Sequence, residues 1–209
     1  MRYWVKTPTI FKRLFPKIVW NFSEKEQKVF LTFDDGPSTN VTDSILTILE
    51  QEKVRATFFC IGKNVKKNPE LADKILKKGH SIGNHSKTHV NGWRTRKNSY
   101  LRNINEASEY INSNLFRPPF GRFNLYSLDQ ILKKYKLVMW DVLSGDFDEK
   151  IEEKAVINNV IKNVANGSII VFHDNNKSKE KTLSVLIKTI KKLKEKGFSF
   201  EAIPFNPVR

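Results

Sequence analysis

The sequence FLTFDDGPS at residues 30–38 places two adjacent aspartates at the end of an apolar segment. The apolar part is typical of a buried β-strand, and the Gly-Pro pair that follows is typical of a turn. Successive side chains of a strand point to opposite faces, so Asp34 and Asp35 can have different partners. The alternative is that both are solvated turn residues, one of which caps a helix beginning near Thr39.

The rest of the chain repeats this order of strand and helix. Strands are predicted at residues 29–33, 55–61, 136–142, 168–172 and 198–203. Helices are predicted at residues 41–51, 69–78, 99–113, 125–134, 152–165 and 181–196. The segments HSIGNH and SNLFR are candidates for two further short strands. Such alternation predicts an α/β fold with a parallel sheet or a (β/α) barrel.

Length and composition indicate one globular domain. The 209 residues are enough for a single full core, and 39% hydrophobic residues argue against a disordered chain. The net charge of +15 favours polyanions, but its lysines are spread over the predicted helices and form no basic and aromatic stripe. Nucleic-acid binding is therefore not expected. No segment is typical of a transmembrane helix or a signal peptide, which favours a cytoplasmic protein.

Polar residues follow several of the predicted strands. They are Asp34, Asp35, His85, His89, Asp146, His173 and Asp174. In a parallel barrel, the carboxyl ends of the strands meet on one face, where active sites are built. We therefore expect these scattered residues to lie close together.

The histidines of NHSKTH indicate a metal site. His85 and His89 are four residues apart, a spacing that would place both rings on one side of a helical turn, although this motif alone often occurs by chance. With one aspartate from another strand end, they form a two-histidine, one-carboxylate set that leaves a position for water. Such a metal lowers the pKa of its water, and the second aspartate of the pair can then accept a proton.

Five motifs, in order, resemble those of the polysaccharide deacetylases, the NodB-homology domain of carbohydrate esterase family 4. They are LTFDDGPS, HSKTH, FRPPFG, WDVLSGDFD and IIVFHD. The resemblance covers residues 28–209 and implies a catalytic domain there, folded as a distorted (β/α) barrel with seven strands. Residues 1–27 are then an N-terminal extension packed on or near the barrel. The family hydrolyses acetyl groups from sugars with one divalent metal ion, commonly zinc, with cobalt or nickel as alternatives, and is often exported.

The resemblance assigns roles to the first three motifs. It implies that Asp34 is the catalytic base and that Asp35, His85 and His89 are the metal ligands. Arg117 is expected to pair with Asp34 and to hold it ionised.

The remaining roles follow from the last three motifs. The backbone N–H of Phe120 is expected to stabilise the oxyanion, His173 to act as the general acid, and Asp146 to orient that histidine. Leu143 and Phe147 depart from residues that are common in the family, but both are apolar, so the resemblance still implies an apolar pocket for the acetyl methyl group, with its size and preference left open.

The function predicted from the resemblance is metal-dependent deacetylation of N-acetylated carbohydrate, such as peptidoglycan or a chitin-like polymer, by a monomer. One alternative is an O-acetyl esterase acting on xylan or a similar glycan, because the same machinery serves both leaving groups. A second is a non-catalytic barrel that binds glycans or polyanions.

Overall fold

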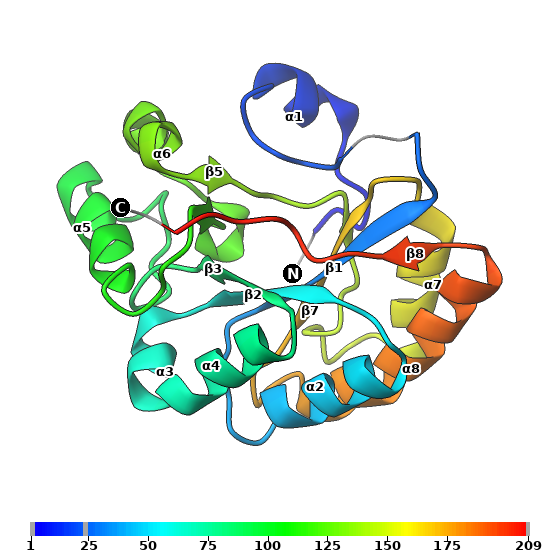
Figure 1. The fold of residues 1–209 in the computed structure, drawn as a ribbon. Helices are drawn as coiled ribbons and strands as arrows, with labels where there is room; N and C mark the ends of the chain where they lie inside the picture. Colours follow the sequence, from blue (N-terminus) through cyan, green and yellow to red (C-terminus); the bar gives the residue numbers. More distant parts are fainter. Residues whose placement is uncertain (1–2, 23–24, 208–209) are drawn as a thin grey trace.

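Seven parallel strands form a curled half-barrel in the computed structural model, which describes residues 3–22 and 25–207. Their spatial order is β5-β4-β3-β2-β1-β7-β6 (Figure 1). The strands are β1 Lys28–Asp34, β2 Ala56–Cys60, β3 Ser81–Asn84, β4 Leu115–Phe116, β5 Lys136–Leu137, β6 Val142–Leu143 and β7 Ile169–His173. A short eighth strand, β8 Ser199–Phe200, pairs with the start of β1. The predicted single-domain, seven-stranded α/β barrel is confirmed.

Helices cover the outer side of this sheet (Figure 1). They are α1 Thr9–Leu14, α2 Thr42–Gln51, α3 Gly62–Lys67, α4 Pro69–Lys77, α5 Lys97–Ala107, α6 Leu128–Lys134, α7 Glu153–Asn163 and α8 Lys179–Glu195, with 3-10 turns η1 Pro119–Gly121 and η2 Leu125–Ser127. The sequence did not predict α1 or α3, which are only six residues long. Too few residues fall in such a helix for a 3.6-residue period to be recognised.

The alternation of β1 separates two environments. Leu31 and Phe33 are fully buried against the outer helices, in the same core as residues of α2, α7 and α8. Thr32 and Asp34 point to the barrel interior, where both bond to Arg117. The opposite end of the interior is filled by a small apolar cluster that includes Phe30. The carboxyl end of β1 therefore brings polar groups into the interior.

The N-terminal segment, residues 3–22, runs along the edge between β5 and β6. The Leu143 N–H donates to the carbonyl of Val5, and the Met139 N–H donates to the carbonyl of Val19, both at 2.8 Å. The predicted single strand at residues 136–142 is therefore wrong. It is divided into β5 and β6 because its middle residues bond to the N-terminal segment instead of continuing one ladder.

Asp141 fastens this segment. It is 2% exposed and lies between Lys6 Nζ at 2.6 Å and Lys12 Nζ at 2.8 Å, and it accepts a further hydrogen bond from the Ser168 hydroxyl. Burial alone would raise the pKa of Asp141, but the hydrogen bonds from Lys12, Lys6 and Ser168 hold it below its usual value.

We expect Asp141→Asn to lower the free energy of unfolding by about 1–3 kcal/mol, because the buried partner of two lysines loses its charge. Urea denaturation at neutral pH measures this loss. Asp43→Asn is the matched control, since its ion pair with Lys74 is exposed on both sides and should contribute less than about 1 kcal/mol. Equal losses in the two variants would contradict a fastening role for Asp141. The Asp141 contribution should disappear as the pH falls through its lowered pKa.

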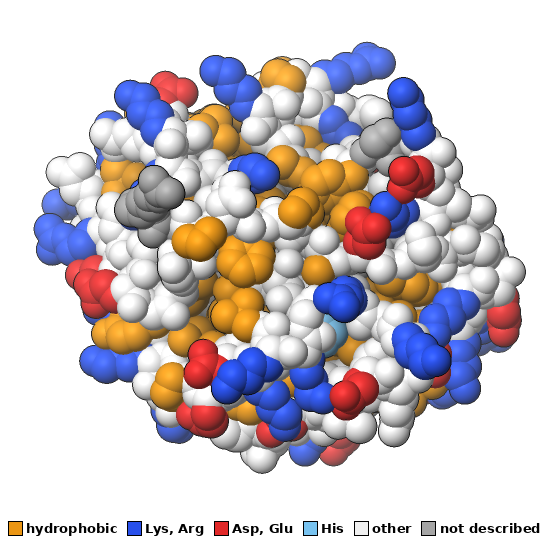
Figure 2. Space-filling view, in the orientation of Figure 1, with side chains coloured by type: hydrophobic (Ala, Val, Ile, Leu, Met, Phe, Trp, Pro, Cys, Tyr) orange, Lys and Arg blue, Asp and Glu red, His pale blue; other side chains and the backbone are white. Residues whose placement is uncertain are grey.

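The surface carries the basic charge in a dispersed form. Figure 2 shows hydrophobic side chains grouped in the middle of one face and Lys and Arg side chains spread around its edge. This agrees with the expectation that the +15 charge forms no binding stripe. Within the described residues, no helix is both long and apolar enough to cross a membrane.

Candidate active site

Arg117 and Asp34 form a buried ion pair at the carboxyl end of β1. Arg117 Nη1 lies 2.6 Å from Asp34 Oδ1 and 2.7 Å from the Thr32 hydroxyl oxygen, and the Arg117 side chain has no exposed surface. Its remaining nitrogens donate to the carbonyls of Val138 and Met139. The guanidinium is therefore fixed on every side, and it holds one carboxylate oxygen of Asp34 in place. The predicted pairing of these two residues is observed.

Asp35, His85 and His89 converge beside this pair. Asp35 Oδ1 lies 3.5 Å from His85 Nε2 and 3.0 Å from His89 Nε2. One ligand atom from each residue lies within 4.8 Å of the other two. Burial opposes ionisation of Asp35, but the adjacent His85 and His89 rings hold the pKa of its carboxyl group far below its usual value. The three predicted metal ligands are thus brought together.

The geometry of this cluster fits a divalent metal ion. Two ligand atoms about 2.0–2.1 Å from one tetrahedral ion lie about 3.3 Å apart, close to the two distances from Asp35 Oδ1. His85 Nδ1 lies 2.7 Å from the carbonyl oxygen of Arg117, which can only accept a hydrogen bond. The proton is thereby placed on Nδ1, and the lone pair of Nε2 is left facing Asp35. This donor set of two imidazoles and one carboxylate suits zinc, and also cobalt or nickel.

Three residues of the site have backbone angles in the left-handed region, and this conformation sets the direction of their side chains. Asp35 has φ 86°, His89 has φ 56° and Phe120 has φ 61°, values that are rare for residues other than glycine. Residues 85–89 form a loop after β3 and no helical turn, so the four-residue spacing of the histidines acts through this loop. Likewise, Asp34 and Asp35 diverge through a left-handed turn at Asp35 and not only through the pleat of the strand. Strained backbone of this kind clusters at functional sites.

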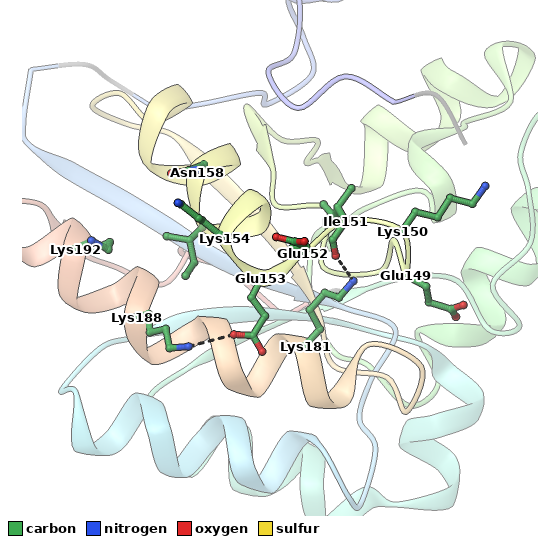
Figure 3. Close-up of a pocket in the computed structure, with 11 residues that line it drawn as sticks. Glu149, Lys150, Ile151, Glu152, Glu153, Lys154, Asn158, Lys181, Lys188 and Lys192 are labelled. Carbon is green, nitrogen blue, oxygen red and sulfur yellow. Dashed lines mark hydrogen bonds and ion pairs between the residues drawn. The ribbon is translucent and has the colours of Figure 1, made fainter.

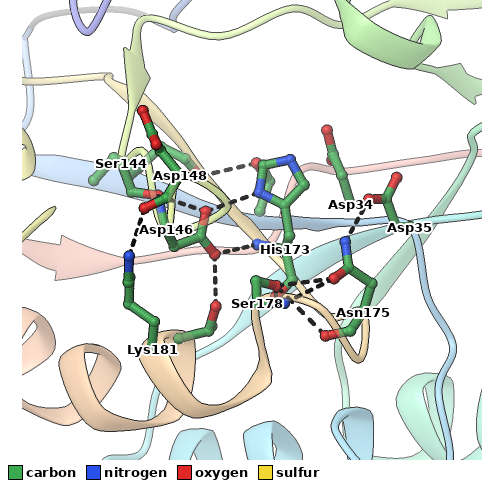
Figure 4. Close-up of polar contacts among 12 residues, drawn as sticks. Asp34, Asp35, Ser144, Asp146, Asp148, His173, Asn175, Ser178 and Lys181 are labelled. Atoms are coloured by element: carbon green, nitrogen blue, oxygen red, sulfur yellow. Dashed lines mark hydrogen bonds and ion pairs between the residues drawn. The ribbon is translucent and has the colours of Figure 1, made fainter. Parts of the chain in front are cut away.

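His173 and Asp146 form a second polar pair next to Asp34. The ring nitrogen His173 Nδ1 lies 2.8 Å from Asp146 Oδ1, and the backbone N–H of His173 donates to Asp146 Oδ2 at 2.7 Å. Hydroxyl groups of Ser144 and Thr182 also donate to the Asp146 carboxylate. Figure 4 shows His173 between Asp146 on one side and Asp34 and Asp35 on the other. The register of β1 and β7 pairs Asp34 with His173, so both side chains face the same side of the sheet.

The surroundings of His173 favour its protonated form. Burial lowers the pKa of its imidazole, but the adjacent Asp146 carboxylate, with smaller contributions from Asp35 and Asp34, raises it to about 9. A histidine with this pKa is an imidazolium at neutral pH and can donate a proton from Nε2.

Two residues to which the sequence assigned no role support the site. The side-chain amide of Asn175 donates to Asp35 Oδ2 at 2.7 Å, which leaves Oδ1 for the histidines (Figure 4). Asp174 is fully buried and accepts hydrogen bonds from the Gly36 N–H and the Thr42 hydroxyl, which fixes the turn after Asp35. The polar sequence HDNN at the end of a buried strand could have indicated that residues 174 and 175 support the site. The sequence does not show which of these side chains faces the aspartates.

A separate hollow of about 780 Å³ lies between α7 and α8 (Figure 3). Two of its lysines are engaged with neighbouring groups: Lys188 pairs with Glu153 at 3.1 Å, and Lys181 donates to the carbonyl of Ile151 at 2.8 Å. The first bond joins α8 to α7, and the second joins α8 to the loop before α7. Among the described residues, glutamates line this hollow but no histidine does, and it is separate from the cluster of carboxylates and histidines described above.

Comparison with known proteins gives consistent matches. The family model of polysaccharide deacetylases matches residues 22–140. A peptidoglycan-N-acetylglucosamine deacetylase of Bacillus cereus is 31% identical over 197 residues, which cover 89% of this chain and 91% of that protein.

Solved structures agree in fold. A peptidoglycan N-acetylglucosamine deacetylase in complex with 4-naphthalen-1-yl-N-oxidanyl-benzamide superposes with a TM-score of 0.87 at 30% identity, covering 95% of each chain. A pseudoenzyme of carbohydrate esterase family 4 from Bacillus anthracis superposes with a TM-score of 0.76 at 25% identity, covering 88% of this chain and 66% of its own. The fold is therefore shared by deacetylases and by at least one relative described as a pseudoenzyme.

Proposed function

This chain belongs to the polysaccharide deacetylase family, and from that premise we propose that it is a metal-dependent hydrolase removing acetyl groups from N-acetylated carbohydrate. The substrate we propose is an N-acetylglucosamine unit of peptidoglycan or of a chitin-like polymer. The observation that carries the proposal is the convergence of the Asp35, His85 and His89 cluster with the Asp34–Arg117 and Asp146–His173 pairs at one end of the barrel.

In the proposed reaction, one residue of the chain accepts a proton and another donates one. Asp34, held by Arg117, accepts the proton of the water molecule that attacks the acetyl carbonyl carbon. The backbone N–H of Phe120 donates to the carbonyl oxygen as it gains negative charge. His173, held by Asp146, gives a proton from Nε2 to the sugar nitrogen as the C–N bond breaks. The products are acetate and a free amine.

Asp35, His85 and His89 would hold the metal ion. When bound, a divalent ion there supplies Lewis-acid polarisation of the carbonyl and lowers the pKa of a bound water. Zinc suits this donor set, with cobalt or nickel as alternatives. The similar solved deacetylase binds 4-naphthalen-1-yl-N-oxidanyl-benzamide, a hydroxamate. Hydroxamates can chelate metal ions through two oxygens, so a deacetylase that binds one supports the proposal of a metal-dependent enzyme.

Two alternatives are distinguished by experiment. An O-acetyl esterase uses the same groups but releases an alcohol, and a non-catalytic barrel, as in the pseudoenzyme relative, releases nothing. Acetate release should be measured for the purified protein with added Zn²⁺ or Co²⁺ on chitooligosaccharides, peptidoglycan fragments and acetylated xylan. We expect release from the first two. Release from xylan alone would establish the esterase, and no release from any substrate would favour the binding barrel.

We expect Asn175→Ala to weaken metal binding about 10- to 100-fold, because the amide that orients Asp35 is lost. His89→Ala removes a proposed metal ligand, so it shows how far metal affinity falls when one ligand is lost. Asn176→Ala is the matched control, since Asn176 is exposed and contacts Ser38 instead of the cluster. Competition with a zinc-binding dye gives the three affinities. An Asn175→Ala affinity equal to that of Asn176→Ala would contradict the orienting role.

A further inference from the structure

A groove of about 380 Å³ lies beside the candidate active site, between the N-terminal segment and the loops that contain Trp93, Phe120 and Leu125. Trp4 and Phe11 lie on the side of the N-terminal segment, and Trp93, Phe120 and Leu125 belong to the loops opposite. The Phe120 ring packs edge-on against His89, with ring centroids 4.5 Å apart. The groove therefore adjoins the place where the acetyl group would react, with the Phe120 ring as the shared wall.

The N-terminal segment also reaches the other side of the site. The ring of Tyr3 lies 5.1 Å from that of Phe147, which in turn lies 5.1 Å from the His173 ring. The segment is fixed by the bond from Leu143 to Val5. Phe147 thus lies between Tyr3 and the proposed acid, and the N-terminal segment, which also lines the groove, is in a position to contact whatever extends from the reacting group.

The aromatic rings of this groove are open to solvent. Trp4 is 63% exposed, Trp93 is 70% exposed and Phe120 is 55% exposed. With Leu125, these are four of the eight large hydrophobic residues that are exposed within the described ranges, and all four line the groove. Contiguous exposed apolar surface of this kind marks a binding surface. Arg122 places its guanidinium 4.9 Å from the Trp93 ring centroid, which adds a hydrogen-bond donor at the edge of the groove.

We propose that this groove binds the sugar rings next to the N-acetylated sugar that reacts, with Trp4 and Trp93 as its stacking surfaces. The inference rests on the proposed function. A pyranose ring presents C–H groups on its faces and hydroxyl groups around its rim, so a half-open groove of aromatic rings contacts the faces and leaves the hydroxyls to water and Arg122. A lipid bilayer is the other candidate for such a surface. A bilayer would cover the rim, but a hollow that opens beside the reacting centre needs an inserted group.

The test compares a long glycan with a small ester. For the metal-loaded wild type and the Trp4→Ala and Trp93→Ala variants, kcat/KM is measured on penta-N-acetylchitopentaose and on p-nitrophenyl acetate, which is too small to reach the groove. We expect each variant to lower the ratio of the two values about 3- to 10-fold, as loss of one aromatic contact does. Tyr126→Ala is the matched control, because Tyr126 is 84% exposed but lies outside the groove lining.

The outcomes separate this inference from the proposed function. Ratios that stay at the wild-type value in both variants, with the wild type active on the pentasaccharide, overturn the groove and leave the deacetylase. A wild type that cleaves the ester but no acetylated glycan overturns the proposed function itself. Co-sedimentation with phosphatidylcholine and phosphatidylglycerol vesicles is run in parallel. Vesicle binding that both variants lose while the ratio is unchanged assigns the surface to a membrane and overturns the sugar site.

Discussion

Asp34→Asn should bind metal almost as well as the wild type and remain inactive at every metal concentration. The substitution keeps the shape of the side chain and leaves Asp35, His85 and His89 untouched, but it removes the proton acceptor. We expect the rate of acetate release to fall on the order of 10²–10⁴. Asp35→Asn should behave in the opposite way. It replaces a charged ligand by a neutral one, so it should lose metal affinity and recover part of its activity when excess metal is supplied.

Metal stoichiometry and acetate release are measured for both variants, with and without added Zn²⁺. Asp34→Asn also leaves the buried Arg117 without its carboxylate, so its free energy of unfolding is measured and rates are expressed per bound metal ion. Loss of metal in Asp34→Asn with retention in Asp35→Asn would reverse the two roles. Full activity in both variants would show that neither aspartate is needed for catalysis and that the pair only forms a turn.

The strand ends show how far the sequence could predict the site. Short apolar runs located β1, β2 and β7, because these strands are buried along almost their whole length, and the 3.6-residue pattern located most helices. Polar residues directly after those strands then predicted the cluster of Asp34, Asp35 and His173. Their convergence depends only on the parallel order of the strands, which alternation with helices implies.

Other features depend on contacts that no local pattern carries. The division into β5 and β6 arises from pairing with Val19, more than a hundred residues away in the chain. Asn175 acts through a hydrogen bond to Asp35, and Asp141 acts through bonds to Lys6 and Lys12. All of these partners are distant in the chain. The left-handed backbone that separates Asp34 from Asp35 is likewise set by the surrounding bonds. The alternation of side chains along a strand predicted that the two aspartates have different partners, but not the left-handed turn that separates them.

His173→Ala should cost on the order of 10²–10⁴ in rate on an N-acetylated sugar, because an amine leaves poorly without a proton. The loss on an activated ester should be much smaller, since its leaving group needs no proton. Equal losses on both substrates would show that His173 is structural. His173 is only 15% exposed, so thermal unfolding of the variant is compared with the wild type to separate loss of fold from loss of the acid.

The pH profile gives an independent measurement of the same role. The acid must be protonated, so activity should fall on the basic side as the pH passes the pKa of His173, which the Asp146 carboxylate raises to about 9 against the effect of burial. A cation held by Asp35 would offset one of the charges that raise this pKa, which places the basic limb at or below that value. His173→Ala should abolish this limb. The wild type should also lose the stability gained from the charged His173 as the pH rises through the same value, because the folded-state pKa lies above the unfolded one.

The Asp146→Asn variant is the sharpest test of whether His173 is the general acid or a structural residue. The variant keeps a side chain of the same size beside His173 Nδ1 but removes the negative charge that raises the pKa of the imidazole. The basic limb of kcat/KM should therefore move to lower pH, while activity persists at pH values below it. Asp148→Asn is the control, because Asp148 is half-buried on the same loop and forms no hydrogen bond with His173 among the described residues. An unchanged limb in Asp146→Asn would mean that His173 is not the group that titrates, and that the proton of the leaving amine comes from elsewhere.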